Sequence, residues 1–119
     1  MAHFVSSTPG KGGTSAFDIN DSGVIAGQFA TVPNVFHGFT FNGDTLTVFD
    51  PPGSTSTEPL SINSSGAIAG LFGDGSNTFT TGFVRDAQGN ITTFNVPNFT
   101  YTLPMGINSS GEITGYVGK

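Results

Sequence analysis

The 119-residue chain has no cysteine, no tryptophan and only three basic side chains. The lack of cysteine excludes disulfides and thiol chemistry. A net charge of −5 argues against nucleic acids and anionic membranes as partners, because both require a basic patch. No apolar run approaches the roughly 18 residues of a membrane-spanning helix. We therefore expect no nucleic-acid partner and no membrane partner.

Helical patterning is also missing. The chain has 18 glycines and 7 prolines, and no long stretch carries apolar residues at three- and four-residue spacing. Phenylalanine, with 12 copies, recurs with threonine, valine and isoleucine in short runs. This composition is typical of strands and turns, with phenylalanine as the main core residue. We predict a single all-β domain over residues 1–119.

The most informative feature is the pattern Ile-Asn-x-Ser-Gly-x-Ile-x-Gly, which occurs at Ile19–Gly27, Ile62–Gly70 and Ile107–Gly115. The copies are 43 and 45 residues apart, which is a usual period for propeller blades or helical arrays. The approximate repeat units are 19–61, 62–106, and 107–119 together with 1–18. The last unit is split between the termini and is shorter than the others. The sequence therefore predicts two complete units and one abbreviated unit.

Each complete unit is predicted to hold four strands. Those of the first unit are Ser15–Asn20, Val24–Ala30, Phe36–Phe41 and Thr45–Phe49. Those of the second unit are Thr57–Asn63, Ala67–Phe72, Thr80–Arg85 and Ile91–Val96. The third unit has strands Tyr101–Asn108 and Glu112–Val117, and one more strand is expected near Ala2–Ser6.

Turn residues separate these strands. Asn-x-Ser-Gly predicts a tight hairpin, because Asn and Gly tolerate left-handed backbone and Asn side chains bond neighbouring amides. Asn42-Gly43 and Gln88-Gly89 predict the same between the third and fourth strands of each unit. The links between units contain proline, which has no amide hydrogen to continue a ladder. The glycine that ends each nine-residue pattern predicts close approach of a neighbouring sheet.

Four strands in about 44 residues favour antiparallel propeller blades, with a β-trefoil or a β-prism of three repeats as alternatives. The pattern Ile19–Gly27 followed by His37-Gly38-Phe39 resembles the HAF-type repeats of bacterial extracellular proteins. The second unit has Thr81-Gly82-Phe83 at this place and so departs from the histidine. The resemblance implies a propeller-like fold and an extracellular or cell-surface parent protein, and it implies no chemistry. From the sequence we expect no signal peptide in this chain.

Three blades do not close a ring, since propellers have four to eight. An open stack would leave two apolar faces and unpaired strands in water, which favours association. The strands over 101–117 could pair with the N-terminal strand of another copy. We therefore expect a homo-oligomer, first a dimer of six blades, then other ring sizes, then a closed monomeric trefoil or prism.

Candidate sites for chemistry are weak. Asp18-Ile19-Asn20-Asp21 begins like a calcium loop but lacks the later bidentate Glu, so a turn is the simpler interpretation. The two histidines, His3 and His37, are too few for zinc. No nucleophile elbow occurs. We predict no catalytic, cofactor-binding or metal-binding residues, no cofactor, and a protein that is not an enzyme.

Two functions remain. The first is a structural module that self-associates into a closed ring. The alternative is a glycan- or small-ligand-binding module that uses the loops Ala30–Val35 and Gly73–Thr78, although tryptophan and tyrosine, the usual sugar platforms, are almost missing. The Asn-x-Ser/Thr sites at Asn20, Asn63, Asn90, Asn98 and Asn108 are interpreted as turn residues rather than sugar acceptors.

Overall fold

The computed structural model describes residues 13–33, 35–75 and 81–119, and this part of the chain forms ten strands and no helix. The strands are β1 Thr14–Ile19, β2 Ile25–Val32, β3 Val35–Phe41, β4 Leu46–Phe49, β5 Ser56–Ile62, β6 Ile68–Gly73, β7 Thr81–Arg85, β8 Ile91–Phe94, β9 Tyr101–Ile107 and β10 Ile113–Gly118. The all-β prediction is confirmed, and the ten predicted strands over residues 15–117 agree within two residues at each end. The strand predicted near Ala2–Ser6 lies outside the described residues.

The strands form two antiparallel meanders and a hairpin. The first meander is β1–β4, the second meander is β5–β8, and the terminal hairpin is β9–β10. One parallel bridge, Phe36 with Ser56, joins β3 to β5, so that the two meanders count as one sheet. Short glycine turns explain the antiparallel order, because they return the chain alongside the strand it has just left.

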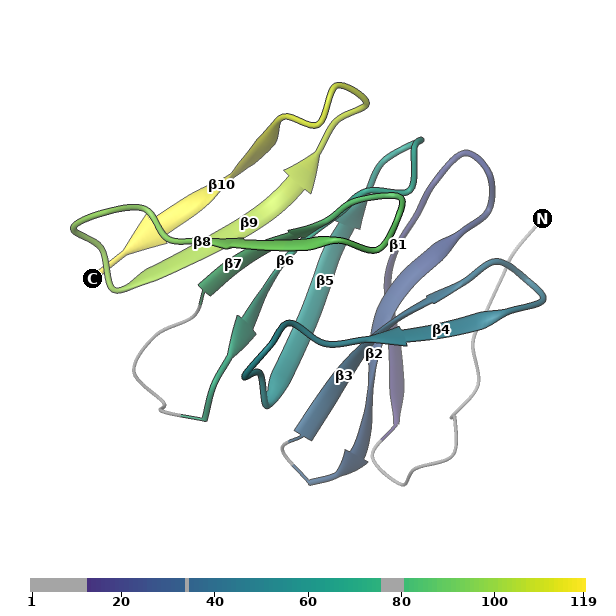
Figure 1. Cartoon of the computed structure of the whole chain (residues 1–119), viewed down its shortest axis with the longest axis horizontal. Coiled ribbons are helices and arrows are strands. Elements are labelled where there is room, and N and C mark those ends of the chain that lie inside the picture. Colours follow the sequence, from purple (N-terminus) through teal and green to yellow (C-terminus); the bar gives the residue numbers. More distant parts are fainter. Residues whose placement is uncertain (1–12, 34, 76–80) are drawn as a thin grey trace.

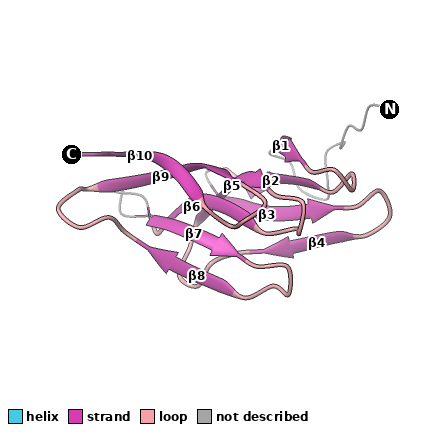
Figure 2. Cartoon of the chain, turned by 90° about the horizontal axis from the view of Figure 1, so that it is seen from above, coloured by secondary structure: helices cyan, strands magenta, loops and turns pink. Residues whose placement is uncertain are grey.

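The three groups of strands lie side by side, with β1 and β10 at opposite ends of the row (Figure 1). Figure 2 shows β4 and β8 at one edge of the molecule and β1, β9 and β10 at the other. The described strands close neither a barrel nor a ring. This open row differs from a β-trefoil or β-prism, in which the first and third units would meet.

The larger apolar cluster joins the two meanders. Ala26 and Phe49 of the first meander pack with a buried set from the second, namely Ile62, Ile68, Phe72 and Phe83. The rings of Phe49 and Phe83 meet edge-on with centroids 6.0 Å apart. The Arg85 guanidinium lies over the Phe49 ring, 4.8 Å from its centroid. A single meander is too thin to bury its own apolar face, so each repeat depends on its neighbour for a core.

The repeated glycines are Gly27, Gly70 and Gly115. The segment that approaches each of them closely is not the one predicted. A Cβ on each would collide with a backbone carbonyl of the strand paired with it: Ser15, Glu58 and Leu103 respectively. The register of β1, β5 and β9 slips at the same place, so that Phe17, Leu60 and Met105 are the extra residues of three β-bulges. The expectation of a neighbouring sheet was therefore wrong, because the bulge brings the adjacent strand of the same sheet too close for a side chain.

The backbone conformations of the hairpin turns agree in part with the prediction. Gly23, Gly66 and Gly111 have φ values of 82°, 90° and 84°, in the left-handed region that favours glycine. The asparagines of these turns do not share that conformation, since Asn98 is the one non-glycine residue with positive φ in the described ranges. Their contribution comes through their side chains instead.

Gly70 tests the bulge. Gly70→Ala should lower the free energy of unfolding by about 1–3 kcal/mol, because the new Cβ meets the Glu58 carbonyl and the Pro59 Cα. The matched control is Gly73→Ala on the same strand, where no heavy atom lies within 4 Å of the new Cβ. Urea unfolding of both variants measures the difference. Equal stability of the two variants would contradict the bulge explanation.

Candidate functional site

Each Asn-x-Ser-Gly turn is organised by its asparagine. The Asn63 Oδ1 accepts hydrogen bonds from the backbone amides of Ser65 and Ala67, at 3.0 and 2.9 Å. Asn20 and Asn108 accept the corresponding two amides of their own turns at the same distances. The carbonyl oxygen of the side chain thus satisfies two amides that the turn leaves without backbone partners.

The amide nitrogen of the same side chain reaches the next repeat. The Asn20 Nδ2 donates to the Asn63 carbonyl at 3.0 Å, and the Asn63 Nδ2 donates to the Asn108 carbonyl at 2.9 Å. At the end of the series the Asn108 Nδ2 donates instead to Oε1 of Glu112 in its own turn, at 2.8 Å. One residue type therefore both closes a turn and connects successive repeats.

A second side chain, two residues before the asparagine, makes a parallel connection. The Asp18 carboxylate accepts the Ile62 amide at 2.9 Å, and the Ser61 hydroxyl accepts the Ile107 amide at 3.2 Å. The third repeat has Gly106 at this position, which has no side chain to continue the series. The connection therefore operates twice among the described residues.

A polar relay lies where the two meanders join. The His37 Nδ1 is 2.7 Å from Asp50 Oδ2, and the other oxygen of Asp50 accepts the Thr57 hydroxyl at 2.7 Å. The His37 Nε2 is 3.2 Å from the Thr31 hydroxyl. Hydroxyl, imidazole and carboxylate in this order resemble a hydrolytic triad. Thr57, which is fully buried, belongs to β5, so the relay also ties the start of the second meander to the first.

Among sites for chemistry, His37 was considered only as a zinc ligand, and this relay was not predicted. The sequence signal was weak, because the second unit has Thr81 and Asn95 at the equivalent positions. The pairing of β3 with β4 brings Asp50, which directly follows β4, beside His37.

The calcium and metal candidates find other partners. Asp18 and Asn20 direct their side-chain oxygens to backbone amides, as described above. Within residues 13–33, 35–75 and 81–119, no group of three or more His, Asp or Glu side chains could hold a metal ion. His3 lies outside the described residues. So do parts of the two loops considered for glycan binding, Ala30–Val35 and Gly73–Thr78.

Glu58 and Asp86 are carboxyl groups of the described residues whose pKa values are shifted. Partial burial on β5 raises the pKa of Glu58, because desolvation disfavours the carboxylate. Hydrogen bonds from the backbone and side chain of Asn90 lower the pKa of Asp86, with further help from the amides of Gln88 and Gly89. Asp86 plays the same role in the β7–β8 turn as asparagine does in the repeated turns.

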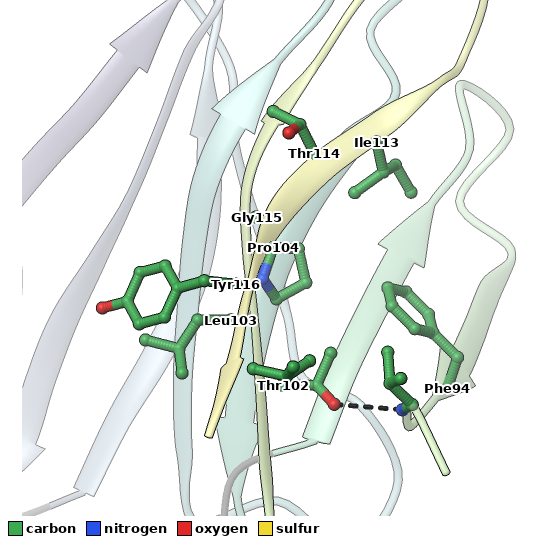
Figure 3. A pocket seen from close by; sticks show the side chains of 10 residues that line it. Phe94, Thr102, Leu103, Pro104, Ile113, Thr114, Gly115 and Tyr116 are labelled. Atoms are coloured by element: carbon green, nitrogen blue, oxygen red, sulfur yellow. Dashed lines mark hydrogen bonds between the residues drawn. The ribbon is translucent and has the colours of Figure 1, made fainter. Parts of the chain in front are cut away.

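A cavity of about 210 Å³ lies between the end of the second meander and the terminal hairpin (Figure 3). Its lining is mostly apolar and consists of Phe94, Val96, Thr102, Leu103, Pro104, Ile113, Thr114, Gly115, Tyr116 and Val117. A hydrogen bond from the Val96 amide to the Thr102 hydroxyl, 3.1 Å long, lies in its wall. An apolar lining suits an apolar group better than a sugar.

Equivalent residues are more exposed at the two ends of the row than in its middle. Ile62 is 5% exposed in the middle, whereas its counterpart Ile19 on β1 is 49% exposed. Ile68 is fully buried, whereas Ile113 on β10 is 37% exposed. Ile25, Phe29 and Phe39 on the outer side of the first meander are nevertheless buried, so the expectation of two bare apolar faces is wrong for that side.

Comparison with family models, with curated proteins and with solved structures finds no match to this chain. The resemblance to HAF-type repeats therefore stays a prediction. In the part of the chain that the structure describes, no helix is long and apolar enough to cross a membrane.

Asn63 provides a test of the connection between repeats. Asn63→Ala should lower the free energy of unfolding by about 2–3 kcal/mol, since it removes three hydrogen bonds at a residue that is 7% exposed. Asn63→Asp keeps the two accepted bonds and removes only the donor to the Asn108 carbonyl. The control is Asn42→Asp, because the Asn42 Oδ1 likewise accepts two amides of its own turn, those of Asp44 and Thr45. In urea unfolding, a loss for Asn63→Asp no larger than that for Asn42→Asp would contradict this role.

Glu58 should make stability depend on pH. Its pKa in the fold is raised above the ordinary value of 4.5, so the folded state holds the proton more tightly than the unfolded chain. The resulting stability is fully present below the unfolded pKa and is lost as pH rises through the folded pKa. Glu58→Gln should therefore be more stable than the parent at pH 7, with the advantage disappearing below about pH 4. Urea midpoints at both pH values, with the exposed Asp44→Asn as control, measure this; a wild-type advantage at pH 7 would contradict it.

Proposed function

We propose that this chain is a non-enzymatic assembly module, a propeller-like segment that joins copies of itself into a closed ring. The observation that carries the proposal is the unpaired outer edge of β10. Among the described strands, β10 pairs with β9 alone. An unpaired edge beside an apolar surface is a typical site of association between chains.

The connection between repeats has a direction, which supports head-to-tail contact. Each asparagine side chain donates to the carbonyl of the next repeat, so the series ends with a donor on Asn108 and begins with an acceptor on Asn20. In the described part of the chain, the Asn20 carbonyl receives the Gly23 amide, while the Asn63 carbonyl receives both the Gly66 amide and a side-chain amide. A second copy could supply the bond that each end lacks.

Glu112 opposes this contact in the free chain. It holds the Asn108 amide at 2.8 Å, and the equivalent residues of the other repeats, Val24 and Ala67, have no group to do so. The outer side of the first meander is also less open than a bare blade, because Ile25, Phe29 and Phe39 are already buried there. These two features favour moderate affinity. Two chains would give six blades.

The test is the mass of the assembly. Native mass spectrometry and light scattering at micromolar concentration should find an oligomer, with the dimer expected first. Glu112→Ala, which matches Ala67, should strengthen association by up to about tenfold, because it frees the Asn108 donor. Glu112→Gln keeps the oxygen acceptor and serves as the matched control. A folded chain that stays monomeric in all three forms would overturn the proposal.

A further inference from the structure

The outer edge of β4 has no partner among the described strands, since β4 pairs with β3 alone. The Asn42 amide donates to the Thr45 carbonyl at 3.3 Å, and this bond closes the ladder at the turn. Bonded and non-bonded pairs alternate in an antiparallel ladder, so Thr47 bonds with β3, whereas Leu46 and Val48 direct their amides and carbonyls away from it. The edge therefore offers both donors and acceptors to an added strand.

The side chains of the same two residues are exposed. Leu46 is 39% exposed and Val48 is 48% exposed. They lie opposite Phe41 and Phe39 of β3, so the four side chains share one face of the first meander. Proteins commonly protect a free edge with a charged residue inside the strand, and β4 has none. An added strand with apolar side chains on this face would extend it.

The corresponding strand of the second meander, β8, is a poorer edge. It pairs with β7, and the bond from the Asp86 amide to the Asn90 carbonyl makes Ile91 and Thr93 its outward residues by the same alternation. Ile91 packs against the apolar cluster between the meanders, and Thr93 is polar. The residues on either side of β8 are Asn90 and Asn95, which carry no charge. An apolar strand with charged ends would therefore favour β4.

Acidic residues flank β4 at both ends. Asp44 lies two residues before the strand, Asp50 directly follows it, and both are exposed. The Asp50 carboxylate is fixed in place by His37 and Thr57. If two copies paired β4 with β4 about Thr47, Asp44 of each copy would lie opposite Asp50 of the other, and like charges directly opposite are destabilising. The same charges attract basic side chains at both ends of the strand, in a chain whose net charge is −5.

We propose that the free edge of β4 binds an extended peptide segment of another protein, in which apolar side chains lie between two basic residues. The segment adds a strand to the first meander, with its backbone bonded to Leu46 and Val48 and its basic ends beside Asp44 and Asp50. Main-chain bonds supply affinity in this mode of recognition, and alternate side chains supply specificity. β4 lies at the opposite edge of the molecule from β1, β9 and β10 (Figure 2), so the inference goes beyond the proposed function and does not depend on it.

A peptide titration followed by NMR tests the edge. The probe is the blocked peptide Lys-Thr-Val-Thr-Val-Thr-Lys, added to isotope-labelled full-length protein. The amide resonances of Leu46 and Val48 should move, whereas that of Thr47, already bonded to β3, should move much less. The matched peptide with glutamate at both ends should bind about tenfold more weakly. Unchanged Leu46 and Val48 resonances, or equal binding of the two peptides, would overturn the proposal. Shifts that depend on protein concentration without peptide would also overturn it, because they would identify a second copy as the occupant.

Asp44→Asn tests the charge at the edge. It should weaken binding of the lysine peptide by about twofold to fivefold, because one exposed ion pair is lost. The control is Asp21→Asn in the β1–β2 turn, which changes the net charge equally at an exposed position and should leave the affinity unchanged. The amide spectrum of each variant shows that its fold is kept. Equal affinities of the two variants would overturn the assignment of a basic partner to this edge.

Discussion

The repeated asparagine side chain is the interaction on which the architecture depends. Its carbonyl oxygen closes one turn and its amide group reaches the backbone of the next repeat, so the conformation of the turn and the spacing of the repeats are coupled. Asparagine suits this place because it carries a donor and an acceptor on one short, rigid group. Aspartate could close the turn, as Asp86 does between β7 and β8, but it has no donor for the neighbouring repeat.

Much of the fold could be predicted because its causes are local. Glycines with positive φ and prolines mark where strands end, and short alternating runs mark the strands between them. The interactions between repeats were not predictable in the same way. The sequence shows that Asn63 recurs, but only the distance between neighbouring sheets decides that its amide reaches Asn108. For the same reason the partner of Gly70 was misjudged, since the bulge in β5 depends on the register of the pairing.

The candidate site was harder to predict because the burial of a residue depends on which elements pack against it as well as on its own type. Ile19 and Ile62 occupy the same place in identical local patterns, yet one is half exposed and the other is buried. The difference is that a meander precedes Ile62, whereas no described strand precedes Ile19 in the row. The His37–Asp50 pair illustrates the same point, because its residues come together only through the pairing of β3 with the strand that precedes Asp50.

Repeats that bury their cores only against one another have an unavoidable problem at the last repeat, which must be capped or must find another copy. The described part of this chain has features that suit each solution. Glu112 satisfies the last asparagine amide and places a charged residue where the other repeats have apolar ones, which is how a cap acts. The terminal hairpin nevertheless keeps an unpaired edge and an apolar cavity, which a cap would cover. A polar cap over the turn restrains contact at one point, while the edge and the cavity favour it along a whole strand. In the proposed assembly the longer surface would outweigh the single hydrogen bond, because burying one large apolar side chain contributes about 1.5–3 kcal/mol, whereas exchanging one hydrogen bond for another changes the free energy by about 1 kcal/mol or less.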